Sequence, residues 1–324
     1  MMSTSAVTIT TVLYNSAHTL PEYCSAITRT LPDGDTKVLV VDNASPDNSA
    51  EVVRTLLPNA CVLYSERNIG FAGACNLSWP HVDSRYWLLL NPDARLTPGA
   101  LSALTSWMDG HPRVAAVTPR LQTATGALHN VVRPHDTLWR PLVELLRLHK
   151  LMPRRLRTRW LLPGSDRMIE EFSGWIPGAA MMVRTAAVRE VGTLDDSLFM
   201  YGEDREWCWR LVQAGWRVGV CTTATVYHAG GTSTTATWGD EMRIRLEVEG
   251  HLRVTCRLRG RTFTRAMAAL TALSLKLTAL QPKTPRQSAV SLSVRSQAYA
   301  RSVFHLPNAT SSRAARGPWS ANGS

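Results

Sequence analysis

Two apolar runs decide the fold, KVLVVDNAS at residues 37–45 and YWLLLNPDA at residues 86–94. Their hydrophobic part is continuous, whereas a strand with one face in water alternates apolar and polar residues. Continuous apolar strands are typical of a parallel sheet that is buried on both faces. Each run then meets polar residues at its carboxyl end, where open α/β sheets bind their ligands. The two stretches therefore predict an α/β protein with a site at one edge of the sheet.

Strand-like and helix-like segments alternate on both sides of these runs. Strands are expected at residues 7–13, 37–41, 61–64, 86–90, 114–117, 172–184 and 217–227. Helices are expected at 20–31, 45–57, 70–79, 98–109 and 203–214, the second with Ser45 as N-cap and Pro46 in its first turn. This alternation indicates a mostly parallel central sheet flanked by helices.

Three further regions depart from the alternation. Residues 120–170 form a basic insertion with arginines among leucines and tryptophans, which we interpret as an amphipathic element over the site or against a surface. Residues 240–304 are helical and basic, and residues 305–324 have the composition of a disordered tail. The predicted organisation is an α/β domain over 1–239, a basic helical C-terminal extension and a disordered end.

The composition is that of a globular chain whose charge is unevenly spread. The 324 residues are 44% hydrophobic and 19% charged, which excludes collagen-like, coiled-coil and wholly disordered proteins. The net charge is +11, from 36 Lys and Arg against 25 Asp and Glu. Residues 251–324 hold 12 of these bases and no acid, which leaves 24 bases against 25 acids in residues 1–250. The C-terminal part therefore supplies the whole positive surplus.

The cysteines and the N-terminus indicate a cytoplasmic protein. Cysteines stand at positions 24, 61, 75, 208, 221 and 256 without a CxxC pair, which is typical of reduced thiols. The first residues lack the basic region of a secretory signal. No apolar stretch reaches the ~18 residues of a membrane span, and the longest candidate, 266–280, is interrupted by Thr, Ser and Lys.

Carboxylates at the predicted strand ends are candidate ligands. Asp42 follows one strand and can accept hydrogen bonds from a nucleobase or ribose, although an Asx-turn that caps the next helix is the competing interpretation. Asp93 lies just past another strand, where its hard oxygens suit Mg²⁺ or Mn²⁺ bridging a diphosphate. Asn-Pro-Asp is also good turn chemistry, but the neighbouring strand end at Asp42 favours a functional role for Asp93.

Two later segments carry further candidates. The segment YGEDREWCWR at 201–210 opens a helix with Glu203 and Asp204. A helix dipole favours acids in any first turn, yet a carboxylate in these aromatic surroundings can also serve as general base for an incoming hydroxyl. His228 precedes two glycines and can ligate a metal or contact phosphate, or be a satisfied structural histidine. The glycines of GFAG at 70–73 are by themselves a weak phosphate signal.

Taken in order, these segments resemble glycosyltransferase family 2, in the branch of bacterial rhamnosyltransferases of cell-wall and O-antigen assembly. The resemblance covers roughly residues 6–235. It is carried by YNS at 14–16, VDNAS at 41–45, RNIGFAGACN at 67–76, NPDA at 91–94, PGAA at 177–180 and YGED at 201–204.

The resemblance implies a GT-A fold and an inverting sugar transfer from a nucleoside-diphosphate donor. Asp42 would bind the nucleobase or ribose, with Asn15 helping. The rest of the donor pocket would be lined by Arg67, Asn68, Gly70 and Asn91.

The resemblance also implies a metal site and a base. Asp93 would be the last acid of the family's DxD motif and hold Mg²⁺ or Mn²⁺, with His228 completing the metal or phosphate contacts. Asn91 stands where that motif has its first Asp, which removes one charge from the metal site. Asp204 would be the base, with Glu203 beside it.

The implied donor is dTDP-rhamnose, while UDP-galactofuranose, UDP-glucose and GDP-mannose remain alternatives because nothing in the sequence fixes the sugar. The implied acceptor is a polyprenyl-diphosphate-linked saccharide or another glycan of the cell envelope. Such lipids lie in the anionic cytoplasmic leaflet, to which each surface Lys or Arg contributes about 1 kcal/mol of binding free energy. The basic insertion and extension therefore predict a peripheral protein at the inner face of the plasma membrane.

Proteins of other classes fit the sequence less well. A basic nucleic-acid-binding protein is the main alternative, but the C-terminal arginines have few aromatic neighbours and the neutral α/β body would be unexplained. No nucleic-acid partner is therefore expected. An inactive scaffold is disfavoured because Asp42, Asp93 and Asp204 are all present.

Overall fold

The structure is a computed structural model, and it describes residues 5–31, 36–123, 126–129, 131–148, 151–153, 171–228, 232–281 and 286–306. The second half of the predicted basic insertion, from residue 154 to 170, lies outside the described residues. So does the predicted disordered tail, apart from its first two residues.

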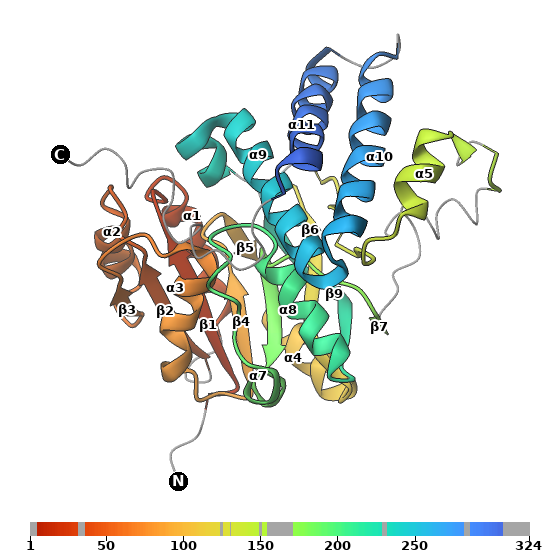
Figure 1. The fold of residues 1–324 in the computed structure, drawn as a ribbon. Helices are drawn as coiled ribbons and strands as arrows, with labels where there is room; N and C mark the ends of the chain where they lie inside the picture. Colours follow the sequence, from red (N-terminus) through yellow and green to blue (C-terminus); the bar gives the residue numbers. More distant parts are fainter. Residues whose placement is uncertain are drawn as a thin grey trace.

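A nine-stranded sheet forms the centre of the molecule, and helices cover both of its faces (Figure 1). Its order is β3-β2-β1-β4-β8-β6-β9-β5, and β7 pairs with β9. The strands are β1 Val7–Leu13, β2 Thr36–Asp42, β3 Cys61–Tyr64, β4 Tyr86–Leu90, β5 Ala94–Leu96, β6 Val114–Gln122, β7 Glu171–Phe172, β8 Ala180–Arg184 and β9 Arg217–His228. Strands β1, β2, β3, β4, β6 and β9 run one way, and β5, β7 and β8 run the other. The predicted mostly parallel α/β sheet is confirmed.

The helices follow the strands in the predicted alternation and then continue as a C-terminal group. They are α1 Leu20–Thr30, α2 Ser49–Leu56, α3 Gly70–Ser78, α4 Ala100–Gly110, α5 Trp139–Leu145, α7 Thr185–Val191, α8 Glu203–Gln213, α9 Thr232–Arg259, α10 Arg261–Ala279 and α11 Arg286–Phe304. A short 3₁₀ turn, Trp79–His81, follows α3. No helix in the described part of the chain combines the length and the apolar character needed to cross a membrane.

Both faces of the sheet are buried, as the continuous apolar strands predict. In β4 the alternate residues Leu88 and Leu90 belong to one core cluster, and Trp87 and Leu89 belong to the other. The first cluster is covered by α1, α2 and α4, and the second by α3, α7 and α8. This two-sided burial leaves the ends of the strands as the place where polar side chains can gather.

Two local predictions were wrong. Helix α2 begins at Ser49 instead of following Ser45, because Ala44 has a positive φ of 58° and the Ser45 amide donates to Asp42 Oδ1 at 3.1 Å. The chain therefore turns once more before the helix starts. The single strand expected at 172–184 is two short strands, β7 and β8, because the intervening Gly- and Pro-containing segment instead pairs with the insertion at Arg133 and Trp175.

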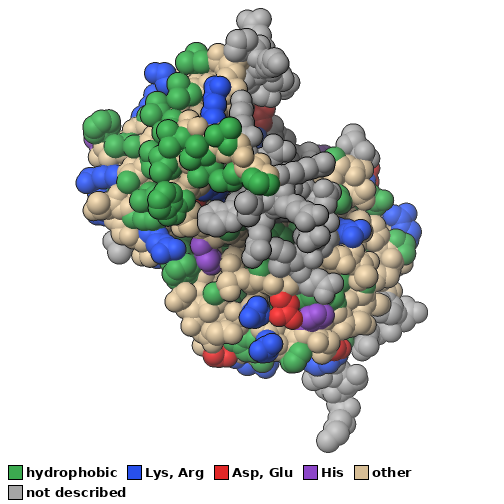
Figure 2. Space-filling model, turned by 90° about the vertical axis from the view of Figure 1, so that its right-hand side faces the viewer, with side chains coloured by type: hydrophobic (Ala, Val, Ile, Leu, Met, Phe, Trp, Pro, Cys, Tyr) green, Lys and Arg blue, Asp and Glu red, His purple; other side chains and the backbone are tan. Residues whose placement is uncertain are grey.

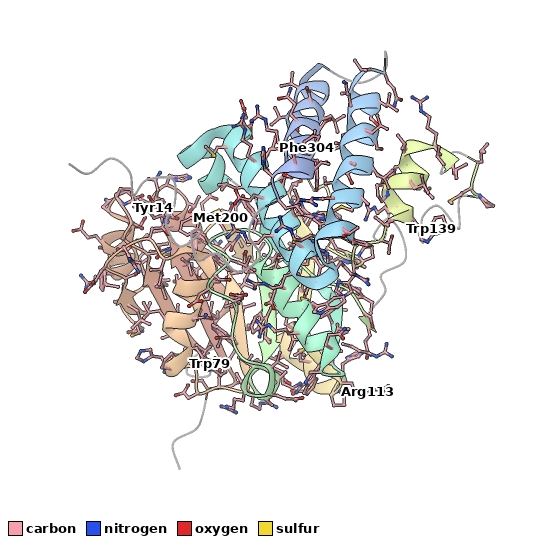
Figure 3. All side chains as sticks on the ribbon, in the orientation of Figure 1. Tyr14, Trp79, Arg113, Trp139, Met200 and Phe304 are labelled. Atoms are coloured by element: carbon pink, nitrogen blue, oxygen red, sulfur yellow. The ribbon has the colours of Figure 1, made fainter. Side chains whose placement is uncertain are left out.

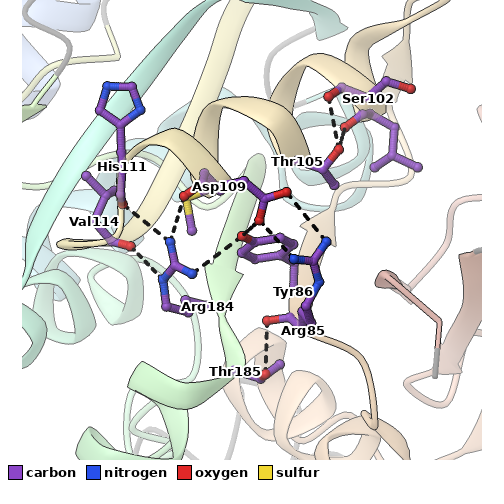
Figure 4. A network of polar contacts seen from close by, with 11 residues as sticks. Arg85, Tyr86, Ser102, Thr105, Asp109, His111, Val114, Arg184 and Thr185 are labelled. Atoms are coloured by element: carbon purple, nitrogen blue, oxygen red, sulfur yellow. Dashed lines mark hydrogen bonds and ion pairs between the residues drawn. The ribbon is translucent and has the colours of Figure 1, made fainter.

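A polar network fastens the end of the sheet opposite to the carboxyl ends (Figure 4). Arg184 on β8 donates to the carbonyls of Met108 at 2.8 Å and Val114 at 3.2 Å. The Tyr86 hydroxyl donates to Asp109 Oδ1 at 2.6 Å. These bonds tie the C-terminal end of α4 to β4 and β8, so that this end is held by structural contacts.

The C-terminal helices stand over the carboxyl-end edge of the sheet (Figure 1). They form a third core with Val248, Leu252, Met267 and Tyr299, against which Leu138 packs. Gly239 has non-helical angles and interrupts α9 at the predicted boundary of the α/β domain. The rest of α9 nevertheless packs directly on the segment that leads into α8.

Glycine makes this packing possible. A Cβ on Gly250 of α9 would lie 2.1 Å from the carbonyl oxygen of Tyr201. A Cβ on Gly202, whose φ is 101°, would lie 2.9 Å from Val254 and 3.0 Å from the carbonyl of Gly250. Two glycines thus let the backbones of α9 and of the segment before α8 touch.

We expect Gly250→Ala to lower the free energy of unfolding by about 1–3 kcal/mol, because the new methyl group forces α9 away from Tyr201. Gly110→Ala is the matched control, because apart from its chain neighbours and the backbone of its own helix no heavy atom lies within 4 Å of the added Cβ. Its effect on the free energy of unfolding should stay within about 0.5 kcal/mol. Urea unfolding of both variants measures the difference. Equal stability of the two variants would contradict the close contact.

Candidate active site

The loops at the carboxyl ends of the strands carry the predicted site. Figure 3 labels Tyr14, just after β1, and Met200, just before α8, on the side of the sheet nearest the C-terminal helices, with Trp79 and Arg113 at the opposite end. Three non-glycine residues in these loops have positive φ, namely Asn15 at 51°, Ala44 at 58° and Tyr201 at 63°. Backbone strain of this kind is typical of functional sites, where the surrounding structure maintains it.

An asparagine pair shapes the loop predicted to line the donor pocket. Asn43, directly after β2, donates through Nδ2 to Asn68 Oδ1 at 2.9 Å and accepts the Ile69 amide at 2.9 Å. Asn68 Oδ1 also accepts the Gly70 amide at 3.0 Å. Asn68 therefore holds its own loop in shape next to the half-buried Asp42.

Gly70 and Arg67, the other residues of this loop that were predicted to line the donor pocket, have different surroundings. Gly70 has a φ of 79°, and a Cβ there would lie 2.2 Å from the carbonyl oxygen of Phe199, which accepts the Phe71 amide at 3.0 Å. Its observed role is thus close packing against the segment before α8. Arg67 is exposed, and its carbonyl accepts the Ser65 hydroxyl at 2.6 Å.

Asp93 and His228, the two candidate metal ligands, lie together. The pairing of β5 with β9 sets Ala94 opposite His228. Asp93 is 8% exposed, and its Oδ1 lies 3.3 Å from His228 Nε2. Asn91 precedes them, and its amide donates to the Ala179 carbonyl at 2.9 Å. The two candidate metal ligands, 135 positions apart in the chain, are therefore in contact at the edge of the sheet.

These residues fit a divalent cation. His228 Nε2 is buried, makes no hydrogen bond among the described residues and lies 3.3 Å from Asp93 Oδ1, so with its proton on Nδ1 the imidazole can offer the Nε2 lone pair to a metal. A carboxylate oxygen with an imidazole nitrogen is a donor set that Mn²⁺ accepts. Within the described ranges no three His, Cys, Asp or Glu side chains converge.

Asp204 lies at the start of α8, between the sheet and the C-terminal helices. Its Oδ2 accepts the Gly178 amide at 3.1 Å, and its Oδ1 accepts the Arg205 amide at 2.7 Å. Burial raises the pKa of Asp204, although the amide of Gly178 and the charge of Arg133 oppose the rise. Asp204 as a whole residue is only partly buried, whereas its neighbour Glu203 is buried.

Glu203 points into the protein interior. It is 7% exposed, and its Oε2 has no hydrogen-bond partner among the described residues. Burial, and next the charge of Asp204, raise the pKa of Glu203 to about 8. The charge of Glu203 in turn adds to the raised pKa of the Cys75 thiol on α3, which is mainly due to burial. Glu203 is thus the buried acidic neighbour of Asp204.

A buried ion pair fixes the helix that carries Asp204. Arg205 is 3% exposed and binds Asp136, which also accepts from Thr255 at 2.6 Å and lies 3.0 Å from His251 Nε2. Burial alone would raise the pKa of Asp136, but the charge and hydrogen bond of His251, with Arg205, hold it well below the usual range. The pair joins α8, the insertion and α9.

Four site residues escaped the sequence interpretation. Asn43 belongs to the VDNAS motif, and its position directly after Asp42 is the sequence feature that could have indicated its role. Gly178 belongs to the PGAA motif and acts through its backbone amide, which every residue except proline has and which the sequence therefore does not single out. His129 Nε2 lies 3.3 Å from the His228 carbonyl, and the backbone of Arg133 pairs with Trp175, three residues before Gly178. Only the fold brings those two near the site.

Two family models match the sequence. Glycosyl transferase family 2 matches residues 8–165, and Glycosyl transferase family group 2 matches residues 87–247. The chain belongs to glycosyltransferase family 2. A relative from Mycobacterium tuberculosis (strain ATCC 25618 / H37Rv), N-acetylglucosaminyl-diphospho-decaprenol L-rhamnosyltransferase, is 29% identical over 213 residues, or 61% of this chain and 67% of the relative. The chain is thus a hexosyltransferase that resembles bacterial rhamnosyltransferases.

Solved structures give the same fold. The mannosyltransferase PcManGT from Pyrobaculum calidifontis, in complex with GDP-Man and Mn²⁺, aligns with a TM-score of 0.57 at 15% identity, over 94% of this chain and 88% of that one. GalNAc-T7 with UDP, GalNAc and Mn²⁺ aligns with a TM-score of 0.57 at 12% identity, over 95% of this chain and 59% of that one. The predicted GT-A fold is confirmed.

We expect Glu203→Gln to remove a pH dependence of stability. The pKa of Glu203 is higher in the folded than in the unfolded state, so protonation of its carboxyl stabilises the folded protein. This stabilisation is complete below the unfolded pKa of about 4.5 and is lost as the pH rises to about 8. At about 1.4 kcal/mol per pKa unit, the variant should gain a few kcal/mol over the wild type between pH 5 and pH 9. Urea unfolding across this range measures the gain, and parallel profiles would show that Glu203 is not buried as a neutral acid.

Proposed function

We propose that the protein is an inverting glycosyltransferase that moves L-rhamnose from dTDP-rhamnose to a hydroxyl of a lipid-linked or polysaccharide acceptor in cell-envelope glycan synthesis. The observation that carries this proposal is the pair of acidic groups at one edge of the sheet. Asp93 with His228 forms one, and Asp204 with the buried Glu203 forms the other. A single displacement needs one group at the departing diphosphate and another at the attacking hydroxyl.

Asp204 is the base in this proposal. The acceptor oxygen attacks the anomeric carbon, its proton passes to an Asp204 carboxylate oxygen, and the bond from the anomeric carbon to the donor diphosphate breaks. The raised pKa of Asp204 brings its basicity closer to neutral pH, which favours proton transfer. The Gly178 amide orients the carboxylate by donating to Oδ2. Because attack and departure occur on opposite sides of the carbon, the anomeric configuration inverts.

The donor lies at the strand ends. Asp42 and Asn15 contact the nucleobase or ribose, and Asn68 and Gly70 shape the pocket wall that Arg67 and Asn91 complete. Asp93 and His228 would hold Mg²⁺ or Mn²⁺, which when bound neutralises negative charge on the departing diphosphate. Mn²⁺ in the two similar solved structures supports the cation.

The donor and the acceptor are supported by the rhamnosyltransferase relative. That enzyme's name specifies an L-rhamnosyl group and an N-acetylglucosaminyl-diphospho-decaprenol. We infer the same chemical classes here, with UDP-galactofuranose, UDP-glucose and GDP-mannose as the alternative donors. The nucleotide preference of the purified protein separates the dTDP, UDP and GDP donors, and the two UDP-sugars are then distinguished by which of them supports transfer.

We expect dTDP to raise the melting temperature more than UDP or GDP does, and more strongly with Mn²⁺ or Mg²⁺. A ligand bound only by the native state adds about 2.7 kcal/mol at a hundred times its dissociation constant. In Asp93→Ala the metal-dependent part of the stabilisation should disappear. A preference for UDP or GDP would change the sugar, and no response to any nucleotide would exclude the donor site.

We expect Asp204→Asn to abolish sugar transfer while donor affinity stays within about twofold. The amide keeps the size of the carboxylate but cannot accept the proton, and loss of a general base costs 10²-fold or more in rate. Turnover of radiolabelled dTDP-rhamnose and calorimetric binding of dTDP measure the two quantities. Near-normal turnover of the variant would show that another group is the base.

We also propose that the protein works peripherally at an anionic membrane, at the inner face of the plasma membrane. Figure 2 shows hydrophobic side chains gathered over the upper part of the molecule, where α5 and α10 lie, with Lys and Arg around them. Leu273, Leu277 and Leu280 form an exposed stripe on α10, and Leu280 is 72% exposed. Trp139, at the start of α5, is 67% exposed.

The charges near this face complement anionic lipid. Arg140, Arg147, Arg265 and Lys276 are exposed on or beside α5 and α10, where Glu144 is the one acid of α5 and α10 has none. An amphipathic face of this kind binds in the plane of a bilayer, with apolar side chains inserted and cations at the headgroups. A lipid-linked acceptor would then reach the site from the surface on which the enzyme rests.

We expect the protein to sediment with vesicles that contain phosphatidylglycerol and not with phosphatidylcholine alone. Leu277→Glu should weaken this binding at least tenfold, whereas Leu56→Glu, at an exposed leucine on α2, should leave it unchanged. Point variants are preferable to truncation because α9 supports the segment before α8. Equal sedimentation with both lipids, or equal loss in both variants, would overturn the membrane proposal.

A further inference from the structure

Arg133 is a cation close to the proposed base that the transfer reaction described above does not use. Its amide and carbonyl pair with Trp175 at 3.1 and 2.8 Å. Three residues after Trp175, the Gly178 amide donates to Asp204. The Arg133 guanidinium lies over the Trp175 ring, 5.2 Å from its centroid. This isolated antiparallel bridge therefore places Arg133 beside the segment that orients Asp204.

The charges around Arg133 come from the acceptor side of the site. They are Asp204 on α8, Arg140 on α5, Glu247 on α9 and Arg295 on α11. Burial lowers the pKa of the guanidinium, and repulsion from Arg140 and Arg295 lowers it further, while Asp204 and Glu247 oppose the change.

Arg133 has donors to offer a ligand. Glu247 accepts from Arg295 at 2.6 Å, and Glu144 accepts from Arg140 at 3.3 Å. Arg133, by contrast, has no carboxylate at ion-pair distance and no side-chain hydrogen bond among the described residues, although the residue keeps an accessible surface. A guanidinium stacked on an aromatic ring is pre-oriented, and its planar N–H groups match phosphate oxygens two at a time.

We propose that Arg133, held over Trp175, binds the diphosphate of a lipid-linked acceptor beside Asp204. This inference rests on the proposed transfer to such an acceptor. In a saccharide-diphosphate lipid of one sugar, a single ring separates the attacking hydroxyl from the diphosphate, so the base and the diphosphate site must be neighbours. The lipid chain would then leave the site toward α5 and α10, where Trp139 and the stripe of Leu273, Leu277 and Leu280 are exposed.

Steady-state kinetics of Arg133→Gln and Arg133→Lys test the proposal, with farnesyl-diphospho-N-acetylglucosamine as acceptor. We expect the acceptor KM to rise at least tenfold in Arg133→Gln and less in Arg133→Lys, which keeps the charge beside Asp204, with the donor KM changed less than threefold in both. Arg85→Gln is the matched control, because Arg85 also lies over an aromatic ring, that of Tyr86 at 5.3 Å, far from the site. For an octyl glycoside of N-acetylglucosamine, which lacks the diphosphate, the KM of Arg133→Gln should equal that of the wild type.

A rise in donor KM instead of acceptor KM would overturn the proposal, as would an equal loss on the octyl glycoside. Calorimetric binding of farnesyl diphosphate, without donor or sugar acceptor, separates the proposal from the proposed function. Tenfold weaker binding by Arg133→Gln supports the diphosphate site even if no sugar is transferred to this acceptor. Unchanged binding in a folded Arg133→Lys and Arg133→Gln refutes the site even if the wild type transfers sugar.

Discussion

The buried ion pair between Arg205 and Asp136 is the interaction on which the arrangement of the site depends. Arg205 is the neighbour of Asp204 on α8, and Asp136 lies in the basic insertion. Thr255 and His251 of α9 bind the same carboxylate. Removing one partner of such a pair leaves an uncompensated buried charge, which costs about 3–5 kcal/mol. Three segments that are distant in sequence are thereby held at the proposed base.

The C-terminal helices are part of the catalytic architecture for this reason. The backbone of α9 touches the segment before α8 through Gly202 and Gly250, and Arg257 binds Asp195 in the same segment. Gly70 approaches the carbonyl of Phe199 from the other side. The segment between β8 and α8 is therefore enclosed by α3 and α9, which explains how the strained Tyr201 conformation is maintained. One surface of the same helical group is left apolar and basic.

The sequence predicted the sheet well because its strands are buried on both faces and are followed by helices, a pattern that depends on local residue order. It assigned Asp93 and His228 to one metal or phosphate site only through the family resemblance, and the contact between them depends on the pairing of β5 with β9, which joins residues far apart in the chain. It misplaced the start of α2, because Asp42 and Ala44 form an extra turn that overrides the helix signal of Ser45 and Pro46. It assigned Asn68 and Gly70 to the donor pocket, and in the fold both also have packing and loop-shaping contacts.

The sequence by itself determined the fold class, the family and the order of the acidic segments, because each of these is written in short contiguous patterns of hydrophobicity and motif residues. Only the tertiary structure decided which of Glu203 and Asp204 is buried and which is accessible, since that depends on how α8 packs against α3 and α9. It also decided that Arg133 lies beside the segment that orients Asp204, because the pairing of residues 133 and 175 is a long-range contact. Contacts of this kind are fixed by the packing of whole elements, and no local pattern encodes them.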